Sequence, residues 1–149
     1  MGQLDADIQA MLNERARTMQ QFTSDHRPMN MYAIYRADLE MPAPKMAAQC
    51  AHAFQGALAN ARLVDPTIDL QYRGTGEGTK LIMYAKNLGQ LIRAYRDCQA
   101  AGIACHLAID RGHVLPPHFD GKPIITALGI GPCFRDEAER ITKRYTLAR

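Results

Sequence analysis

Strand-like and helix-like segments alternate along most of this chain, and this alternation constrains the fold more than any other feature. Residues 31–36 form an apolar strand pattern, which is followed by a helical pattern over about 45–63. A second strand pattern at 80–85 and a second helical pattern at 88–101 repeat the arrangement. Helical crossovers between strands are right-handed and lay helices on both faces of a largely parallel sheet. The pattern therefore predicts an α/β fold.

The C-terminal third of the chain adds an antiparallel element to this sheet. Alternating apolar residues over 103–109, after the helix-ending Gly102, predict a third strand. A fourth strand at 124–130 follows without an intervening helix, so it runs antiparallel to the third, and a final helix is expected over about 136–147. We predict a single-domain three-layer α/β/α fold with a four-stranded mixed sheet. The glycine-rich segment 74–78 precedes a strand, which indicates a loop and not a nucleotide-binding fingerprint.

The first residues of the chain lie outside this alternating pattern. Apolar residues at near-helical spacing predict an amphipathic helix over 3–24, and the segment 23–28 interrupts it. We divide the chain into an N-terminal helical extension at 1–27 and a domain at 28–149. An apolar stripe left in water is costly, so the helix is expected to dock on the domain or to mediate self-association, with a free tail as the alternative.

Composition sets limits on compartment and partners. The net charge of +3 is spread along the chain, so charge alone does not indicate a nucleic acid partner. No segment has the length of a membrane span, the N-terminus lacks the layout of a signal peptide, and the cysteines show no paired spacing. We expect a cytoplasmic protein without a membrane segment, whose cysteines are small buried residues in a reducing compartment. The cysteines are Cys50, Cys98, Cys105 and Cys133.

Lys45 occupies an unusual position at the start of the helix expected after the first strand. Pro42 and Pro44 suit a helix entry, which puts Lys45 in the first turn. The positive end of the helix dipole disfavours a cation there and attracts anions. Gln49 and His52 continue the same polar stripe at i+4 and i+7. Lys45 is therefore expected to face a negatively charged group.

The residues of this region resemble a known family, the peptidyl-tRNA hydrolases of the second type. The hallmark of that family is an Asp-Leu-x-Met turn followed by Lys-x-Ala-Ala-Gln-Cys-x-His-Ala. The pattern is present here at Asp38, Leu39, Met41, Lys45, Ala47, Ala48, Gln49, Cys50, His52 and Ala53. A glycine-lysine pair that the family carries before the lysine is replaced by Pro42 and Ala43.

A second block supports the resemblance in part. The segment 126–132 matches the family's last core strand, and Asp110, Gly112 and His113 match its preceding turn. Val114 and Leu115 stand where the family has threonine and glutamine, and Arg111 replaces a small residue. The resemblance covers about 31–147 and implies the four-stranded mixed sheet and a homodimer.

The resemblance implies hydrolysis of the ester between a peptide, or an N-blocked amino acid, and tRNA, which recycles the tRNA without a metal or other cofactor. Ester hydrolysis needs a positioned water and a stabilised oxyanion. Strands one and three end at one edge of the sheet, so Lys45 and Asp110 are expected to face one pocket. We expect Asp110 to place the water and Lys45 to bind phosphate or stabilise charge, with His113 replacing part of the missing threonine. The expected substrate-binding residues are Asp38, Gln49 and His52.

Each residue also has a purely structural interpretation. Lys45 can be a solvated surface lysine, Asp110 can cap a turn, and Asp38 is better explained by a turn backbone than by substrate. Gln49 and His52 fit packed, hydrogen-bonded positions better than acid or base roles. Two functional alternatives also remain: a non-catalytic tRNA- or protein-binding module on the same fold, favoured by the replaced threonine and glutamine, and a hydrolase of a different ester or amide.

Overall fold

The computed structural model describes residues 2–23, 27–74 and 76–149. A five-stranded sheet with the order β3-β6-β1-β2-β7 forms its centre. The strands of this sheet are β1 (Met29–Arg36), β2 (Thr79–Ala85), β3 (Cys105–Asp110), β6 (Ile124–Phe134) and β7 (Thr146–Leu147). The helices are α1 (Gln3–Thr23), the 3-10 helix η1 (Ala37–Leu39), α2 (Ala43–Val64), α3 (Pro66–Gly74), α4 (Leu88–Ala101) and α5 (Arg135–Thr142).

The pairing of the strands confirms the mixed sheet. Strands β1 and β2 are parallel, whereas β6 runs antiparallel to both β1 and β3. The sheet differs from the expected one by a fifth strand. The helix expected over 136–147 ends at Thr142, and the chain then turns so that Thr146 and Leu147 pair with β2. Tertiary pairing with an open sheet edge overrides the helical pattern at this end.

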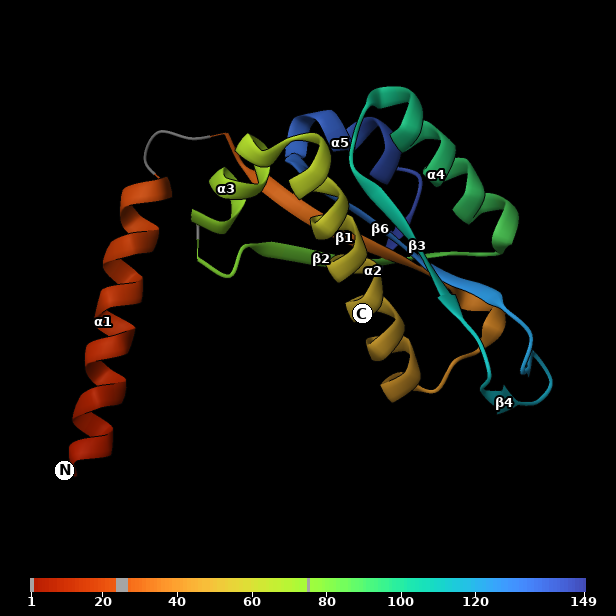
Figure 1. Cartoon of the computed structure of the whole chain (residues 1–149), viewed down its shortest axis with the longest axis horizontal. Coiled ribbons are helices and arrows are strands. Elements are labelled where there is room, and N and C mark those ends of the chain that lie inside the picture. The colour runs from red at the N-terminus through yellow and green to blue at the C-terminus, as the bar shows by residue number, and fades with distance from the viewer. Residues whose placement is uncertain (1, 24–26, 75) are drawn as a thin grey trace.

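Helices cover the two faces of the sheet, as expected for three layers (Figure 1). Helix α2 packs on the face formed by Ala33, Ala108 and Ala127, and α4 and α5 pack on the opposite face. Helix α2 lies very close to β6, because a Cβ built on Gly129 would lie only 1.9 Å from the carbonyl oxygen of Ala53. Small residues on both elements therefore fix the position of α2 and of the side chains at its N-terminus.

A short helix and a separate small sheet were also not expected from the sequence. Helix α3 begins at Pro66 directly after the break at Asp65, and its buried Asp69 pairs with Arg73 at 2.7 Å and Arg62 at 3.4 Å. A separate two-stranded sheet, β4 (Val114–Leu115) with β5 (Phe119–Asp120), stands between β3 and β6. Both elements are short, so their periodic patterns were too brief to recognise.

Helix α1 confirms the expected N-terminal helix and projects away from the sheet and its covering helices (Figure 1). Its apolar residues Ile8, Met11 and Leu12 are 43%, 58% and 52% exposed. Arg15 lies 3.8 Å from Glu77 in the loop before β2. The described apolar side chains thus do not dock on the domain of the same chain. The side chains of Leu4, Met19 and Phe22, and residues 24–26 of the expected break, lie outside the described residues.

The cysteines are free thiols, and Cys50, Cys98 and Cys133 are buried, whereas Cys105 is half-buried. Burial raises the pKa of Cys50 to about 11 and that of Cys133 to about 12. These two thiols are therefore protonated near neutral pH and are poor nucleophiles. Among the described residues, no helix combines the length and apolar character that crossing a membrane requires.

Candidate active site

Lys45 lies in the first turn of α2, as the proline pattern predicted. Pro42 is the N-cap residue, and its carbonyl oxygen accepts the first helical hydrogen bond, from the N–H of Met46, at 2.9 Å. The structure records no acidic residue in this first turn. The side chain of Lys45 is 12% exposed, so it is not the solvated surface lysine of the structural alternative. Its charge must be balanced by a group from another element.

Asp110 supplies that balancing charge from the end of β3. Its Oδ2 lies 3.0 Å from the Nζ of Lys45, and its side chain is 15% exposed. The two residues are 65 positions apart in the chain, and their proximity confirms the convergence expected at this edge of the sheet. Among the described residues, no hydrogen bond engages Oδ1 of Asp110. This oxygen is therefore available to a water molecule or a substrate.

His113 completes a second contact with Lys45. Its Nδ1 lies at short hydrogen-bonding distance from Nζ of Lys45. An ammonium group can only donate hydrogen bonds, so Nδ1 accepts, and the proton of the neutral ring is assigned to Nε2. The ring belongs to an exposed residue. His113 can therefore present its Nε2–H as a hydrogen-bond donor.

The hairpin formed by β4 and β5 places His113 beside the ion pair. Gly112, with a φ of +80°, turns the chain after β3, and its N–H donates to the carbonyl of Gly121 at 3.0 Å. A positive φ of this kind favours glycine. Phe119 lies on β5, is 2% exposed, and has its ring centroid 4.2 Å from the Nζ of Lys45. Sequence reasoning missed Phe119, although the prolines at 116–117 and the Asp120-Gly121 pair do indicate turns around it.

Asp38 is engaged by its neighbour Arg36. The guanidinium donates from Nε and Nη2 to the two carboxylate oxygens at 3.1 and 2.7 Å, and from Nη1 to the carbonyl of Ile125 at 3.0 Å. The hydrogen bond from Arg36 lowers the pKa of Asp38, and the charge of His118 adds to this effect. The structure therefore shows Asp38 as one half of a bidentate ion pair that ties η1 to β6, beside the β4–β5 hairpin.

Gln49 and His52 lie on the same side of α2 but in different surroundings. Gln49 is 6% exposed, and its Oε1 accepts a hydrogen bond of 2.7 Å from the hydroxyl of the fully buried Thr126. His52 is exposed, so the packed position favoured by its structural interpretation is wrong. It borders a shallow hollow with His106 and Ile109. The structure thus brings Lys45, Asp110 and His113 together and places Gln49 in the packing beneath them.

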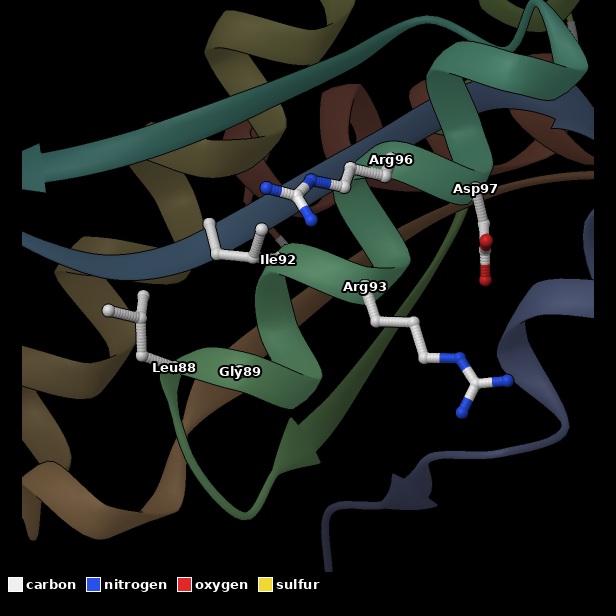
Figure 2. Close-up of a pocket in the computed structure, with 6 residues that line it drawn as sticks. All are labelled: Leu88, Gly89, Ile92, Arg93, Arg96 and Asp97. Atoms are coloured by element: carbon white, nitrogen blue, oxygen red, sulfur yellow. The ribbon is translucent and has the colours of Figure 1, made fainter.

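A hollow on α4 lies elsewhere on the molecule. Figure 2 shows Leu88, Ile92 and Arg96 pointing to one side of this helix, and Arg93 and Asp97 pointing to the other. Because α4 and α2 cover opposite faces of the sheet, this hollow is separate from Lys45. Within the described ranges, no group of three or more His, Cys, Asp or Glu side chains could hold a metal ion.

Comparison with known proteins agrees with this arrangement. A family model described as Peptidyl-tRNA hydrolase PTH2 matches residues 29–148. The chain is 35% identical over 115 residues to a peptidyl-tRNA hydrolase of Methanothermobacter thermautotrophicus, which covers 77% of this chain and 93% of the relative. It is 31% identical over 115 residues to a peptidyl-tRNA hydrolase of Methanococcus vannielii, and this match covers 76% of this chain and 94% of the relative. A third peptidyl-tRNA hydrolase, from Methanocaldococcus jannaschii, is 30% identical over 120 residues, which cover 80% of this chain and 99% of the relative.

Fold and site together define an α/β protein with a lysine–carboxylate pair at the carboxyl edge of a mixed sheet. The matched family model spans the sheet and every helix except α1. The chain belongs to the peptidyl-tRNA hydrolase PTH2 family.

Proposed function

We propose that this chain hydrolyses the ester bond between a peptide, or an N-blocked amino acid, and tRNA. Family membership supports the substrate class. The observation that carries the chemistry is the pair of Lys45 and Asp110, with Nζ and Oδ2 3.0 Å apart and both side chains largely withdrawn from solvent. Charges that are held in place with little water between them interact more strongly with a reacting ester than exposed charges do.

The proposed reaction uses each of three side chains in a different way. Asp110 orients a water molecule through its unengaged Oδ1, and the water oxygen attacks the ester carbonyl carbon. Lys45 holds the carboxylate and supplies positive charge as the oxyanion develops, while His113 offers its Nε2–H as a further donor. When the carbon–oxygen bond to the ribose breaks, the leaving oxygen takes up the proton that the water has lost. The products are a free peptide and a tRNA with its ribose hydroxyl restored.

We propose different roles in substrate binding for Asp38, Gln49 and His52. His52 is exposed on the side of α2 that carries Lys45, so it can contact a bound tRNA end or peptide. Gln49 is buried and paired with Thr126, which favours support of the pocket over direct contact. Asp38 acts through Arg36, whose position it fixes at the same edge of the sheet.

The test is release of free tRNA from an N-blocked aminoacyl-tRNA by the purified chain. Wild type is compared with Lys45→Ala and Asp110→Asn, and the expected loss in kcat is about 10²-fold or more for each. Lys143→Ala serves as the control, because Lys143 is an exposed residue at the end of α5, on the far face of the sheet. Equal rates in all four proteins would contradict the proposed site.

A non-catalytic binding module is the second candidate, and Val114 favours it. This residue stands in the turn where the resemblance implies threonine, and its side chain cannot position a water molecule. If wild type releases no tRNA but shifts tRNA in a binding assay that weakens with salt, the binding module is the better account. If it does not interact with tRNA, a different ester or amide substrate becomes the favoured proposal.

We further propose that the chain divides at residue 28, works in the cytoplasm and forms a homodimer in which α1 takes part. The first half of α1 carries Asp5 and Asp7, and the second half carries Arg15 and Arg17. Antiparallel pairing of two copies would bring these opposite charges together and cover the exposed apolar residues. Sedimentation of the full chain and of a chain lacking residues 1–27 tests this: the same oligomeric state for the two would remove α1 from the interface.

A further inference from the structure

The aromatic ring of Phe119 lies against Lys45 and His113 but has no role in the reaction proposed above. Phe119 is 2% exposed, and the Nζ of Lys45 lies over its ring at 4.2 Å from the centroid. The same ring lies 6.2 Å from the ring of His113, at an interplanar angle of 49°. A single buried side chain therefore contacts two of the three groups to which catalytic roles are assigned.

Three neighbouring side chains contact the ammonium group of Lys45. The group has three N–H donors, and two of its neighbours, Asp110 and His113, are hydrogen-bond acceptors. The face of the Phe119 ring lies against the same group. The negative face of an aromatic ring attracts a cation, and this attraction is stronger where water is excluded. The ring thus takes the place that water would otherwise fill.

The backbone of the hairpin determines where this ring lies. Phe119 pairs with Leu115 across the two short strands, and the N–H of Gly112 bonds to the carbonyl of Gly121 at the base. His113 directly follows Gly112 and belongs to the same hairpin. Because one closed unit carries both side chains, the ring and the imidazole reach Lys45 together.

We propose that Phe119 is a positioning residue for the hydrolysis, holding the ammonium of Lys45 against Asp110 and His113 and keeping water away from it. This inference rests on the proposed function. It assigns to Phe119 no contact with the substrate. Loss of the ring should therefore lower kcat and leave KM nearly unchanged, because the substrate's own contacts remain.

A spectroscopic measurement tests the contact directly. Protons above an aromatic ring resonate upfield, so the ε-methylene protons of Lys45 should be shifted upfield in the wild-type protein. Phe119→Leu and Phe119→Met keep apolar volume without a ring and should return these signals to ordinary positions. Phe119→Tyr keeps the ring and should preserve the shift. An unshifted Lys45 signal in wild type would overturn the proposal.

Kinetics on N-blocked aminoacyl-tRNA test the role. We expect about a tenfold lower kcat for Phe119→Leu and Phe119→Met, since a desolvated cation–ring contact is strong enough to account for such a change, and a near wild-type kcat for Phe119→Tyr. Val114→Ala is the matched control, because Val114 is on the same hairpin and 63% exposed. It should keep the wild-type rate.

The outcomes separate this inference from the proposed function. Active wild type with undiminished Phe119→Leu and Phe119→Met variants overturns the role of Phe119 and leaves the hydrolase proposal intact. An equal loss in Val114→Ala also overturns it, because the effect would then belong to the hairpin as a whole. An inactive wild type overturns both. Loss confined to the two ringless variants, with rescue by Phe119→Tyr, supports the inference.

Discussion

At the scale of single residues, Lys45 is the side chain around which the site is assembled. Asp110 reaches it from β3, His113 from the turn after that strand, and Phe119 from the hairpin. No acidic residue lies in the same helical turn as Lys45. These distant partners therefore balance the charge of its largely buried ammonium group, which would otherwise be costly to bury.

Replacing His113 tests the donor that replaces the missing threonine. We expect His113→Ala to lower kcat about tenfold to 10²-fold, because one hydrogen bond to the developing oxyanion is lost. The measurement is single-turnover release of tRNA from an N-blocked aminoacyl-tRNA, with the exposed His52→Ala as a comparison that should act mainly on KM. An undiminished rate in His113→Ala would remove this residue from the mechanism.

The buried hydrogen bond between Thr126 and Gln49 can be tested by its effect on stability. The hydroxyl of Thr126, fully buried, donates to Gln49, and Thr126→Val would leave the buried Oε1 of Gln49 without that partner. We expect the free energy of unfolding in urea to fall by about 1–3 kcal/mol. Thr146→Val, at an exposed position on β7, should change it by less than about 0.5 kcal/mol. Similar small effects for both would show that the buried hydrogen bond contributes little.

At the scale of elements, the close approach of α2 to β6 positions the N-terminus of the helix. Gly129 allows this approach, because any Cβ there would overlap the backbone of Ala53 at 1.9 Å. The obstacle is main chain, so it cannot move aside as a flexible side chain could. The helix itself would have to shift, and Lys45 would shift with it.

Gly129→Ala should therefore impair both stability and activity. We expect a loss of about 3 kcal/mol in the free energy of unfolding, at the upper end of the range for overpacked cores. Gly89→Ala is the control, because Gly89 is exposed in the first turn of α4 and a Cβ there would meet only the Asn87 side chain, at 3.4 Å, so a change of less than about 0.5 kcal/mol is expected. Chemical denaturation of both variants gives the comparison, and a well-tolerated Gly129→Ala would contradict the tight packing.

At the scale of the whole molecule, the buried Asp69 should make the free energy of unfolding decrease at acid pH. Its side chain is 3% exposed, and the hydrogen bond from Arg73 lowers its pKa below the ordinary value of 3.8. The folded state therefore holds this proton less tightly than the unfolded state does. The stabilisation is present above pH 3.8 and is lost as the pH falls through the folded pKa. Asp69→Asn should flatten the decline in unfolding free energy there, and an unchanged pH profile would contradict this assignment.

Sequence reasoning reached the parts of the molecule that repeat a local rule. Lys45 and Asp110 could be paired from the sequence because strand ends and the helix starts that follow them meet at one edge of a sheet. Phe119 could not be placed, because two-residue strands beside a proline pair lack a readable period. The helix expected over about 136–147 ends at Thr142, because the pairing of Thr146 and Leu147 with β2 is a tertiary contact that a helical pattern cannot reveal.

The small β4–β5 sheet has a thermal consequence. It is paired through only two residues on each strand, and isolated hairpins of this kind are marginally stable, so it should open at a lower temperature than the five-stranded sheet. Opening would withdraw the imidazole and the phenyl ring while the main fold persists. Warming should therefore cost this protein its turnover, reversibly, some degrees before circular dichroism registers melting, and coincident transitions would show that the hairpin is as firmly anchored as the core.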